Sequence, residues 1–460
     1  MSALGEGFAA LAEEAERLSA ELRDLRVATR PDRAALRDEV ERAFPLEGPV
    51  PLRRLVGEAA RILRVHAVHV VHPRYFGLYN PSVREASVLG DALAALYNPQ
   101  LAVWAHAPGA AELEQHALRR LASALGRDGD AAHFTSGGSE ANLTAVLCAL
   151  AHLAPGWEAG GVRALRARPA IYASREAHHS LMKVARMTGL GGEALREVPV
   201  DARLALCVPA LEARLAGDRA AGFSPMAVVG TAGTTSAGVV DPLPALAELS
   251  ARQGVWFHVD AAYGGAAALV PRLRGTLTGI ERADSVTFDA HKGLSVPMGA
   301  GMFFCRHPEA LRRAFAVTAT YMPSADAAEP YTSTVEWSRR TIGLKVLFAL
   351  AESGLAGAGA LFDEQCRMGD LLRDRLRRAG YTLVNDTPLP VVCFRHPDLA
   401  AGRLTAAALC ARVVGRGRAW ISEVILDGRL EALRACITSH LTREADLDLL
   451  LEELEAARTA

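Results

Sequence analysis

Three short apolar runs between residues 255 and 304 constrain the fold more than any other part of this chain. They contain His258-Val-Asp260-Ala-Ala262, Asp289-Ala-His291-Lys292 and Gly299-Ala-Gly301, and each has the composition of a strand that delivers polar residues at its end. Buried parallel strands have this pattern, and ligands of open α/β sheets lie at the carboxyl ends of such strands. The stretch therefore predicts an α/β protein whose site combines an acid at one strand end with a lysine just past another.

Lysine is rare in this chain and is therefore informative. Only Lys183, Lys292 and Lys345 are lysines among the 51 basic residues. A lysine can lose its proton and form a Schiff base, whereas an arginine can do neither. Taken alone, Lys292 is equally well explained as a surface residue. The neighbouring segments Asp289-Ala-His291 and Asp260-Ala-Ala262 favour a lysine that forms an imine with a carbonyl cofactor.

A glycine-rich turn supplies a candidate anion site. Ser136-Gly137-Gly138-Ser139 lies between an expected strand, 131–135, and an expected helix, 140–153. Glycines let backbone N–H groups approach an anion, and a helix N-terminus adds positive potential. An ordinary helix cap is the alternative. A hydrolase nucleophile elbow is disfavoured, because Ala141 replaces the second glycine of that motif.

These motifs together resemble one enzyme family. The segments that carry the resemblance are His258-Val-Asp260-Ala-Ala262-Tyr-Gly-Gly, Asp289-Ala-His291-Lys292, Ser136-Gly-Gly-Ser-Glu-Ala-Asn, Ala177-His178-His-Ser and Gly233-Thr-Thr. In order and spacing the chain resembles the group II pyridoxal-phosphate (PLP) decarboxylases, which include aromatic amino acid, glutamate and diaminobutyrate decarboxylases. The resemblance extends from about Pro73 into the C-terminal region.

The resemblance implies a fold and a domain organisation. The expected fold class is α/β, the fold type I of PLP-dependent transferases, similar to aspartate aminotransferase. It comprises a large domain with a mixed, mostly parallel sheet and a small α+β C-terminal domain. We expect an N-terminal helical segment at 1–80 that packs on a partner subunit, the PLP-binding domain at 81–350 and the small domain at 351–460. The implied activity is decarboxylation of an L-amino acid to an amine and carbon dioxide.

The resemblance also implies roles for individual residues around the cofactor. Lys292 would hold PLP as a Schiff base, and Asp260 would pair with the pyridine nitrogen. His178 would stack on the pyridine ring, and Ala262 is small enough to let the ring lie flat. The remaining candidates are Gly138, Ser139 and His291 for the phosphate, and Thr235, Asp241 and Asp289 around the cofactor; a helix cap would also explain Asp241.

Substrate residues are expected in two further segments. The loop 72–82 corresponds to a segment that lines the substrate entrance in the relatives, which makes Tyr79 and Ser82 candidates. Trp104 and His106 lie in a stretch that is near the substrate in the relatives.

Tyr331 is the expected donor of the proton to Cα. It lies in a polar loop, 323–337, before Arg339-Arg340, and relatives place a tyrosine in a mobile loop before such a pair. Tyr321 and Trp337 are its local competitors. A loop of this composition has little to bury, so we expect it to be mobile.

Departures from the family pattern leave the substrate open. Gly293 stands where the relatives usually have a bulky residue, and Gln100 and Ala102 lie in a stretch that is bulkier in the aromatic-specific enzymes. The alternatives are another PLP reaction on the same fold, namely a decarboxylation-dependent aldehyde synthase, an aminotransferase or a C–C lyase. A catalytically silent PLP-fold binding protein is a third hypothesis.

The amino-acid composition indicates which binding partners and which cell compartment to expect. The net charge is −1 with both signs interspersed, so we expect no nucleic-acid or membrane partner. No signal peptide, transmembrane span or metal site is expected, and seven scattered cysteines favour reduced thiols in the cytoplasm.

An apolar seam with heptad spacing covers Phe8, Leu11, Ala15, Leu18, Leu22 and Leu25. It indicates a helix that packs either on its own domain or, as the resemblance favours, on the partner of a homodimer.

Overall fold

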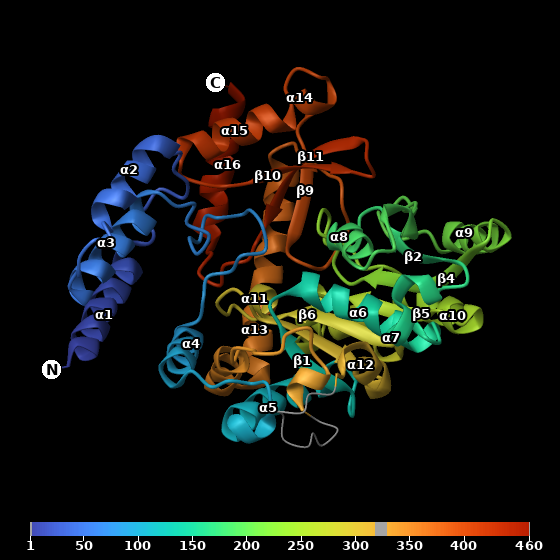
Figure 1. Ribbon diagram of the computed structural model, residues 1–460. Helices are drawn as coiled ribbons and strands as arrows, with labels where there is room; N and C mark the ends of the chain where they lie inside the picture. The colour runs from blue at the N-terminus through green and yellow to red at the C-terminus, as the bar shows by residue number, and fades with distance from the viewer. Residues whose placement is uncertain (1, 318–328, 460) are drawn as a thin grey trace.

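The large domain is built around a seven-stranded sheet (Figure 1). The structure, a computed structural model, describes residues 2–317 and 329–459. The strand order is β1-β7-β6-β5-β4-β2-β3. The strands are β1 (Ala131–Thr135), β2 (Arg168–Ser174), β3 (Leu195–Val198), β4 (Phe223–Thr231), β5 (Trp256–Asp260), β6 (Ser285–Asp289) and β7 (Gly301–Cys305).

Most neighbouring strands of this sheet run parallel, and β7 is the exception. The pairs β2–β3, β2–β4, β4–β5 and β5–β6 are parallel, whereas β7 runs antiparallel to both β1 and β6. The predicted mixed, mostly parallel sheet is therefore confirmed. The parallel direction expected for the run that includes Gly301 is wrong. Only residues 290–300 connect β6 to β7, which is too short for a crossover and returns the chain antiparallel.

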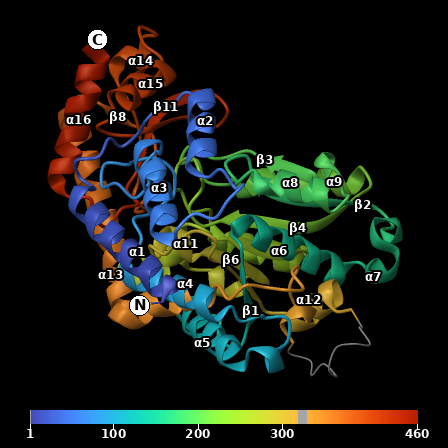
Figure 2. The same cartoon turned by 60° about the vertical axis from the view of Figure 1, so that its left-hand side comes forward.

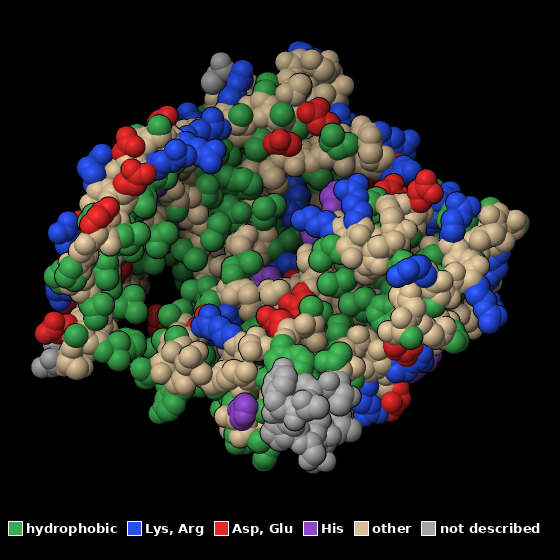
Figure 3. Space-filling model, in the orientation of Figure 1, with side chains coloured by type: hydrophobic (Ala, Val, Ile, Leu, Met, Phe, Trp, Pro, Cys, Tyr) green, Lys and Arg blue, Asp and Glu red, His purple; other side chains and the backbone are tan. Residues whose placement is uncertain are grey.

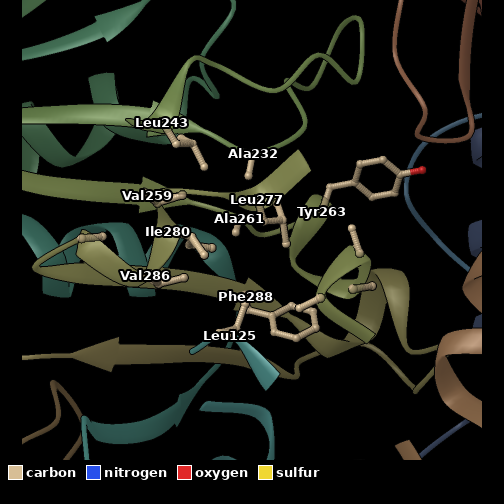
Figure 4. Packing of buried hydrophobic residues seen from close by; sticks show 14 of the residues in the cluster. Leu125, Ala232, Leu243, Val259, Ala261, Tyr263, Leu277, Ile280, Val286 and Phe288 are labelled. Carbon is tan, nitrogen blue, oxygen red and sulfur yellow. The ribbon is translucent and has the colours of Figure 1, made fainter. Parts of the chain in front are cut away.

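Helices cover both faces of the sheet, as the apolar composition of its strands requires. Alternate residues of a strand point to opposite faces, so β5 contributes Trp256 to one core and Val259 to the other. Figure 4 shows Val259, Val286 and Phe288 packed on the second face. The helices on the Trp256 face are α6 (Gly138–Leu153), α8 (Ser180–Met187) and α12 (Pro308–Phe315), and those on the opposite face include α5 (Pro108–Ala124), α9 (Val208–Ala220) and α10 (Leu243–Gln253).

A smaller antiparallel sheet forms the C-terminal domain. Its order is β10-β11-β9-β8, with β8 (Thr382–Leu383), β9 (Val391–Arg395), β10 (Ser422–Leu426) and β11 (Leu430–Cys436). The helices of this domain are α14 (Pro397–Ala400), α15 (Ala406–Arg416) and α16 (Glu444–Thr459). The segment at 74–77 joins it, because Phe76 N–H donates to Trp420 O and Cys436 N–H donates to Phe76 O. The loop that was expected to line the substrate entrance is thereby fixed to the small domain.

The long helix α13 (Gly343–Arg378) connects the two domains. It bends at Gly354, where φ is +69°, a conformation that glycine adopts readily. Within the described residues α13 is the one helix with the length and composition to cross a membrane. Sixteen of its residues are buried, and it packs on α4 (Glu85–Tyr97), on α5 and on the turn at Gly264–Leu269, as the core helix of a folded domain does.

The N-terminal helices lie at one side of the molecule in Figure 1 and in front of the other elements in Figure 2. They are α1 (Ala3–Glu21), α2 (Arg33–Ala43) and α3 (Leu52–Val65), and α1 packs along α3. Phe8 and Leu11 of the heptad seam are exposed in this single chain, whereas Leu22 is buried. Figure 3 shows hydrophobic side chains gathered in the hollow between these helices and the rest of the molecule.

Candidate active site

A cavity of about 270 Å³ lies at the edge of the large sheet where β5 and β6 end and α6 begins. Parallel strands bring their carboxyl ends to one edge, which is where ligands of such sheets bind. Most of the residues that the sequence suggested meet here. The lining consists of Tyr79, Ser136, Gly137, Gly138, Ser139, Asn142, His178, Thr235, Asp260, Ala262, Tyr263, Asp289, His291, Lys292 and Met298.

Strand β5 delivers Asp260 to the cavity. Its carboxylate is 6% exposed and accepts two hydrogen bonds, from Ala262 N–H at 3.1 Å and from Asn142 Nδ2 at 2.9 Å. A buried carboxylate without such partners would be strongly disfavoured. The two bonds fix the side chain at the strand end, directed to the cavity that Ala262 also lines.

Strand β6 and the short helix α11 (Ala290–Gly293) deliver the lysine. Lys292 Nζ lies 2.9 Å from Asp289 Oδ2, and its side chain is 21% exposed, whereas that of Asp289 is 2% exposed. The ammonium also faces the Tyr79 ring, 5.7 Å from its centroid. A Cβ atom at Gly293 would approach Ala266 Cβ to 2.4 Å, so a bulky residue after the lysine would not fit here without a backbone shift.

The start of α6 forms the third wall. Gly138 is its first residue, and a Cβ atom there would lie 3.0 Å from Asp289 Oδ2 and 3.2 Å from Ala262 Cβ. This close approach favours a residue without a side chain, because the neighbouring atoms would have to shift by a few tenths of an ångström to admit a Cβ. Ser139 is exposed, and both residues present a helix N-terminus to the cavity, where an anion is stabilised by free N–H groups and the helix dipole.

His178 and His291 complete the polar lining. Burial lowers the pKa of both imidazoles, which favours their neutral forms. His178 Nδ1 accepts a hydrogen bond from Ser180 N–H at 3.2 Å, and His291 Nδ1 accepts one from Ala300 N–H at 3.2 Å. The second ring nitrogen of each can therefore carry the proton and act as a donor.

Tyr79 forms a fixed aromatic wall. Its hydroxyl lies 3.1 Å from Thr234 O and 3.0 Å from Thr235 O, so its one proton is committed to these carbonyls. Its ring stacks on Tyr263 with centroids 4.1 Å apart and on the Arg434 guanidinium at 4.9 Å. Tyr79 therefore contributes a ring face to the cavity and is not a free acid.

The cavity fits PLP in its donor set. It offers an amine for the aldehyde, a carboxylate for the pyridine nitrogen and a helix N-terminus for the phosphate. Asp289 Oδ1 is buried and has no hydrogen-bond partner among the described residues. Unpaired buried polar atoms are rare, and a bound polar ligand is one explanation for such an atom.

Two sequence candidates lie outside the cavity. Asp241 is buried behind the sheet, where its carboxylate accepts N–H bonds from Thr231 at 2.8 Å and Leu206 at 2.7 Å, and burial raises its pKa to about 7. It does not cap α10, which begins after Pro242 without a side-chain cap. Ser82 is also buried, and its hydroxyl donates to Val71 O at 2.6 Å.

Trp104, His106 and Tyr331 also lie away from the cavity within this chain. Trp104 and His106 form an exposed turn, η1 (Trp104–His106). Tyr331 is 5% exposed, its N–H donates to Ala102 O, and its ring stacks on Trp337 at 4.6 Å. Its competitor Tyr321 lies outside the described residues. In the parts of the chain that are described, no group of three or more His, Cys, Asp or Glu is placed to hold a metal ion.

The structure adds residues that sequence reasoning did not single out. Asn142 holds Asp260, and Met298 lines the cavity rim, where its carbonyl accepts from Lys345 Nζ at 2.9 Å. Arg434 lies buried behind Tyr79 with its Nη2 unpartnered among the described residues. Asn142 is the last residue of the motif that begins at Ser136, so the sequence contained a signal for it. Its partner Asp260 lies 118 residues further along the chain, and local sequence does not reveal that contact.

Known proteins resemble this chain over most of its length. A family model described as the pyridoxal-dependent decarboxylase conserved domain matches residues 35–397. L-2,4-diaminobutyrate decarboxylase of Rhizobium meliloti (strain 1021) is 31% identical over 385 residues, which cover 82% of this chain and 76% of that protein. Cysteine sulfinic acid decarboxylase of Mus musculus is 30% identical over 423 residues, which cover 88% of this chain and 85% of that protein.

Solved structures agree with these sequence relatives. The crystal structure of mouse CSAD superposes with a TM-score of 0.89 at 27% identity and covers 99% of this chain and 98% of its own. The structure of Oryza sativa TDC with PLP and tryptamine gives a TM-score of 0.90 at 26% identity, with 99% and 97% covered. The predicted family, fold type and cofactor are thereby confirmed. The chain belongs to the pyridoxal-dependent decarboxylase family and is a PLP-dependent carboxy-lyase that acts on an amino acid.

Proposed function

We propose that this cavity is the PLP site of the decarboxylase, with Lys292 as the covalent anchor of the cofactor. The observation that carries the proposal is the meeting of the Lys292 amine and the Asp260 carboxylate at one cavity beside the start of α6. Gly138, Ser139 and His291 would hold the phosphate, and His178 and Ala262 would face the ring. Thr235 and Asp289 belong to the same lining, whereas Asp241 and Ser82 support neighbouring loops.

The residues divide the chemistry between them. When bound, PLP supplies an electron sink that lets a bond at the substrate Cα break. Asp260 would place a carboxylate beside the pyridine nitrogen, which favours the protonated form of that nitrogen. Asp289 orients the Lys292 amine through the 2.9 Å contact, and the Tyr79 ring limits the access of water from one side.

Decarboxylation of an L-amino acid to the amine and carbon dioxide is the reaction we propose. The relatives named above act on different amino acids, and binding geometry at Cα decides which bond breaks. A panel of L-amino acids tests the proposal, including 2,4-diaminobutyrate, cysteine sulfinate, glutamate, tryptophan and tyrosine. We expect amine and carbon dioxide in equal amounts from at least one of them. Aldehyde with ammonia, or a keto acid without carbon dioxide, would instead support the aldehyde synthase or aminotransferase alternative.

We further propose that the enzyme is a homodimer. The support is the exposed apolar surface of the N-terminal helices, with Phe8 and Leu11 on α1, and of α4, with Leu89 and Tyr97. Exposed apolar patches of this kind are typical of subunit interfaces. Trp104 and His106, which lie away from the cavity in one chain, remain candidates for substrate contacts in such a dimer.

Sedimentation tests the homodimer. The native protein should sediment at twice the mass of the chain. Phe8→Lys should shift it toward the monomer, because burying an unpaired ammonium in an interface is strongly unfavourable. The control, Glu16→Lys, places a lysine on the polar side of α1 with an even larger change of charge, from −1 to +1, and should leave the dimer intact. An active monomer in the native protein would overturn the proposal.

Tyr331 is the proposed donor of the proton to Cα, although it packs on Trp337 in this chain. Its role requires the segment that holds it to leave this packing. In Tyr331→Phe we expect amine formation to fall by about 10²-fold or more, because a positioned acid is lost, while PLP stays bound. Molecular oxygen and water would then be consumed in place of the proton at Cα, so aldehyde, ammonia and hydrogen peroxide should be detected beside carbon dioxide. Tyr381→Phe, the same change at another buried tyrosine, is the control. Amine formation at the native rate in Tyr331→Phe would leave His178 as the next candidate.

A further inference from the structure

A row of buried polar side chains lies on the side of the sheet that α6 covers. Alternation along β5 places Trp256, His258 and Asp260 on one face. The parallel pairing sets Ser285 of β6 beside His258 and Thr287 beside Asp260. All five side chains are at least 94% buried. The row leads from the middle of the domain to the carboxylate at the cavity.

Four hydrogen bonds connect the row without a gap. Trp256 Nε1 lies 2.9 Å from Ser285 Oγ, and Ser285 Oγ lies 2.9 Å from His258 Nδ1. His258 Nε2 lies 3.1 Å from Asn142 Oδ1, and Asn142 Nδ2 lies 2.9 Å from Asp260 Oδ2. Asn142 itself is 1% exposed, so no step of the row competes with bulk water.

The chemistry of the two ends fixes the direction of the terminal bonds, and the bonds at His258 follow from its neighbours. An indole N–H can only donate, and a carboxylate can only accept. Asn142 must therefore turn its amino group to Asp260, and its Oδ1 accepts from Thr287 Oγ1–H at 2.9 Å and from His258 Nε2–H at 3.1 Å. A neutral His258 then has a bare Nδ1, which accepts the hydroxyl proton of Ser285, while the Ser285 oxygen accepts from Trp256.

One competing arrangement exists at His258. The backbone oxygen of Ser285 lies 3.2 Å from Nδ1, so a proton on Nδ1 would also find an acceptor. A neutral ring with that proton would turn a bare Nε2 toward Asn142 Oδ1, 3.1 Å away, which is repulsive. The Thr287 hydroxyl, 3.3 Å from Nε2, could donate to it only by giving up its shorter bond of 2.9 Å to Asn142 Oδ1. A doubly protonated ring is disfavoured, because burial lowers the pKa of His258 to about 4; Arg127 acts in the same sense and Asp260 against it.

We propose that this one-way row is a positioning device for Asp260, and that His258, Ser285 and Trp256 are positioning residues of the decarboxylase. Hydrogen bonds that point the same way along a chain strengthen one another. The row keeps the Asn142 amide in one orientation, and this amide together with Ala262 N–H holds the carboxylate in one rotamer. The inference rests on the proposed role of Asp260 toward the pyridine nitrogen of PLP.

Ser285→Ala removes the hydroxyl that connects Trp256 Nε1 to His258 Nδ1. We expect PLP binding to weaken by about tenfold, in the range that follows when a buried group loses its partner, and kcat to fall by a similar factor. The matched control is Ser250→Ala, since Ser250 is 1% exposed and its hydroxyl has no partner among the described residues. The control should bind PLP within twofold of the native enzyme. Equal behaviour of the two variants would overturn the proposal.

Two measurements separate positioning from a general packing effect. With ¹⁵N-labelled PLP, the pyridine nitrogen should report a protonated ring in the native enzyme and a partly unprotonated one in Ser285→Ala. The pair His258→Gln and His258→Asn tests the donor at Nε2. A glutamine amide can reach the position of Nε2, whereas an asparagine amide reaches only that of Nδ1. We expect His258→Gln to retain most of the PLP affinity and His258→Asn to lose about tenfold, again the loss of one buried partner.

The tautomer of His258 can be read without cofactor or substitution. In the apoenzyme with ¹⁵N-labelled histidine, at pH 7, His258 should carry one proton, on Nε2. A proton on Nδ1, or a doubly protonated ring, would contradict the proposed direction of the hydrogen bonds, even if the enzyme decarboxylates normally. Conversely, failure of the native protein to bind PLP would contradict the proposed function. The tautomer of His258 would then still test the proposed hydrogen-bond direction independently.

Discussion

Replacement of Lys292 by alanine or arginine should abolish covalent attachment of PLP and lower decarboxylation by more than about 10³-fold. Alanine removes the amine, and the arginine guanidinium does not form an imine. The same amine is also the group placed to exchange protons at the cavity, an effect that alone is typically worth about 10²–10⁴-fold. Absorbance of the bound cofactor and carbon dioxide release measure the two losses separately.

The control for this prediction is Lys183→Ala. Lys183 is exposed on α8 and does not line the cavity, so its loss should leave both the cofactor absorbance and turnover unchanged. If Lys292→Ala retained turnover within tenfold of the native enzyme, Lys292 would not be the anchor.

Asp260→Asn should preserve the fold and remove most of the activity. The amide is nearly the same size as the carboxylate, but it no longer provides the charge that favours a protonated pyridine nitrogen. Electrostatic contributions of this kind are worth about 10²–10³-fold in kcat. The new amide also faces Asn142 Nδ2, which donates to Asp260 at 2.9 Å, so PLP should bind more weakly as well.

Asp363→Asn is the matched control, since Asp363 pairs with Arg272 on the surface and has no contact with the cavity. Thermal unfolding of both variants checks that the fold is intact. Turnover of Asp260→Asn within a few-fold of the native enzyme would contradict the assignment of Asp260.

The strand ends of the large sheet could be predicted because local signals and tertiary structure agree there. Residues 256–260 and 285–289 are apolar runs of strand length that end in acids, and both are strands in the structure. Parallel pairing then brings Asp260 and Asp289 to one edge, with Lys292 one turn beyond. The glycine-rich turn at the start of α6 could be predicted for the same reason, because its local sequence and its place between a strand and a helix agree.

The positions of the other site candidates depend on contacts between distant parts of the chain, which local sequence does not encode. Asp241 carries the local signal of a helix cap, yet its carboxylate bonds to Thr231 and Leu206, because the loop after β4 folds back on its own strand. Ser82 lies in a turn-rich loop, yet it is buried next to Ser439 of the small domain. The support of Asp260 by Asn142 arises only when α6 packs across β5.

Reduction of the native holoenzyme with borohydride, followed by peptide mass spectrometry, tests the central claim most directly. Reduction converts the bond between the cofactor and the lysine into a stable amine, so the pyridoxyl label stays on its anchor. The chain offers only three lysines, which makes the assignment unambiguous. The label should be found on Lys292. A label on Lys183 or Lys345, or no label at all, would contradict the account.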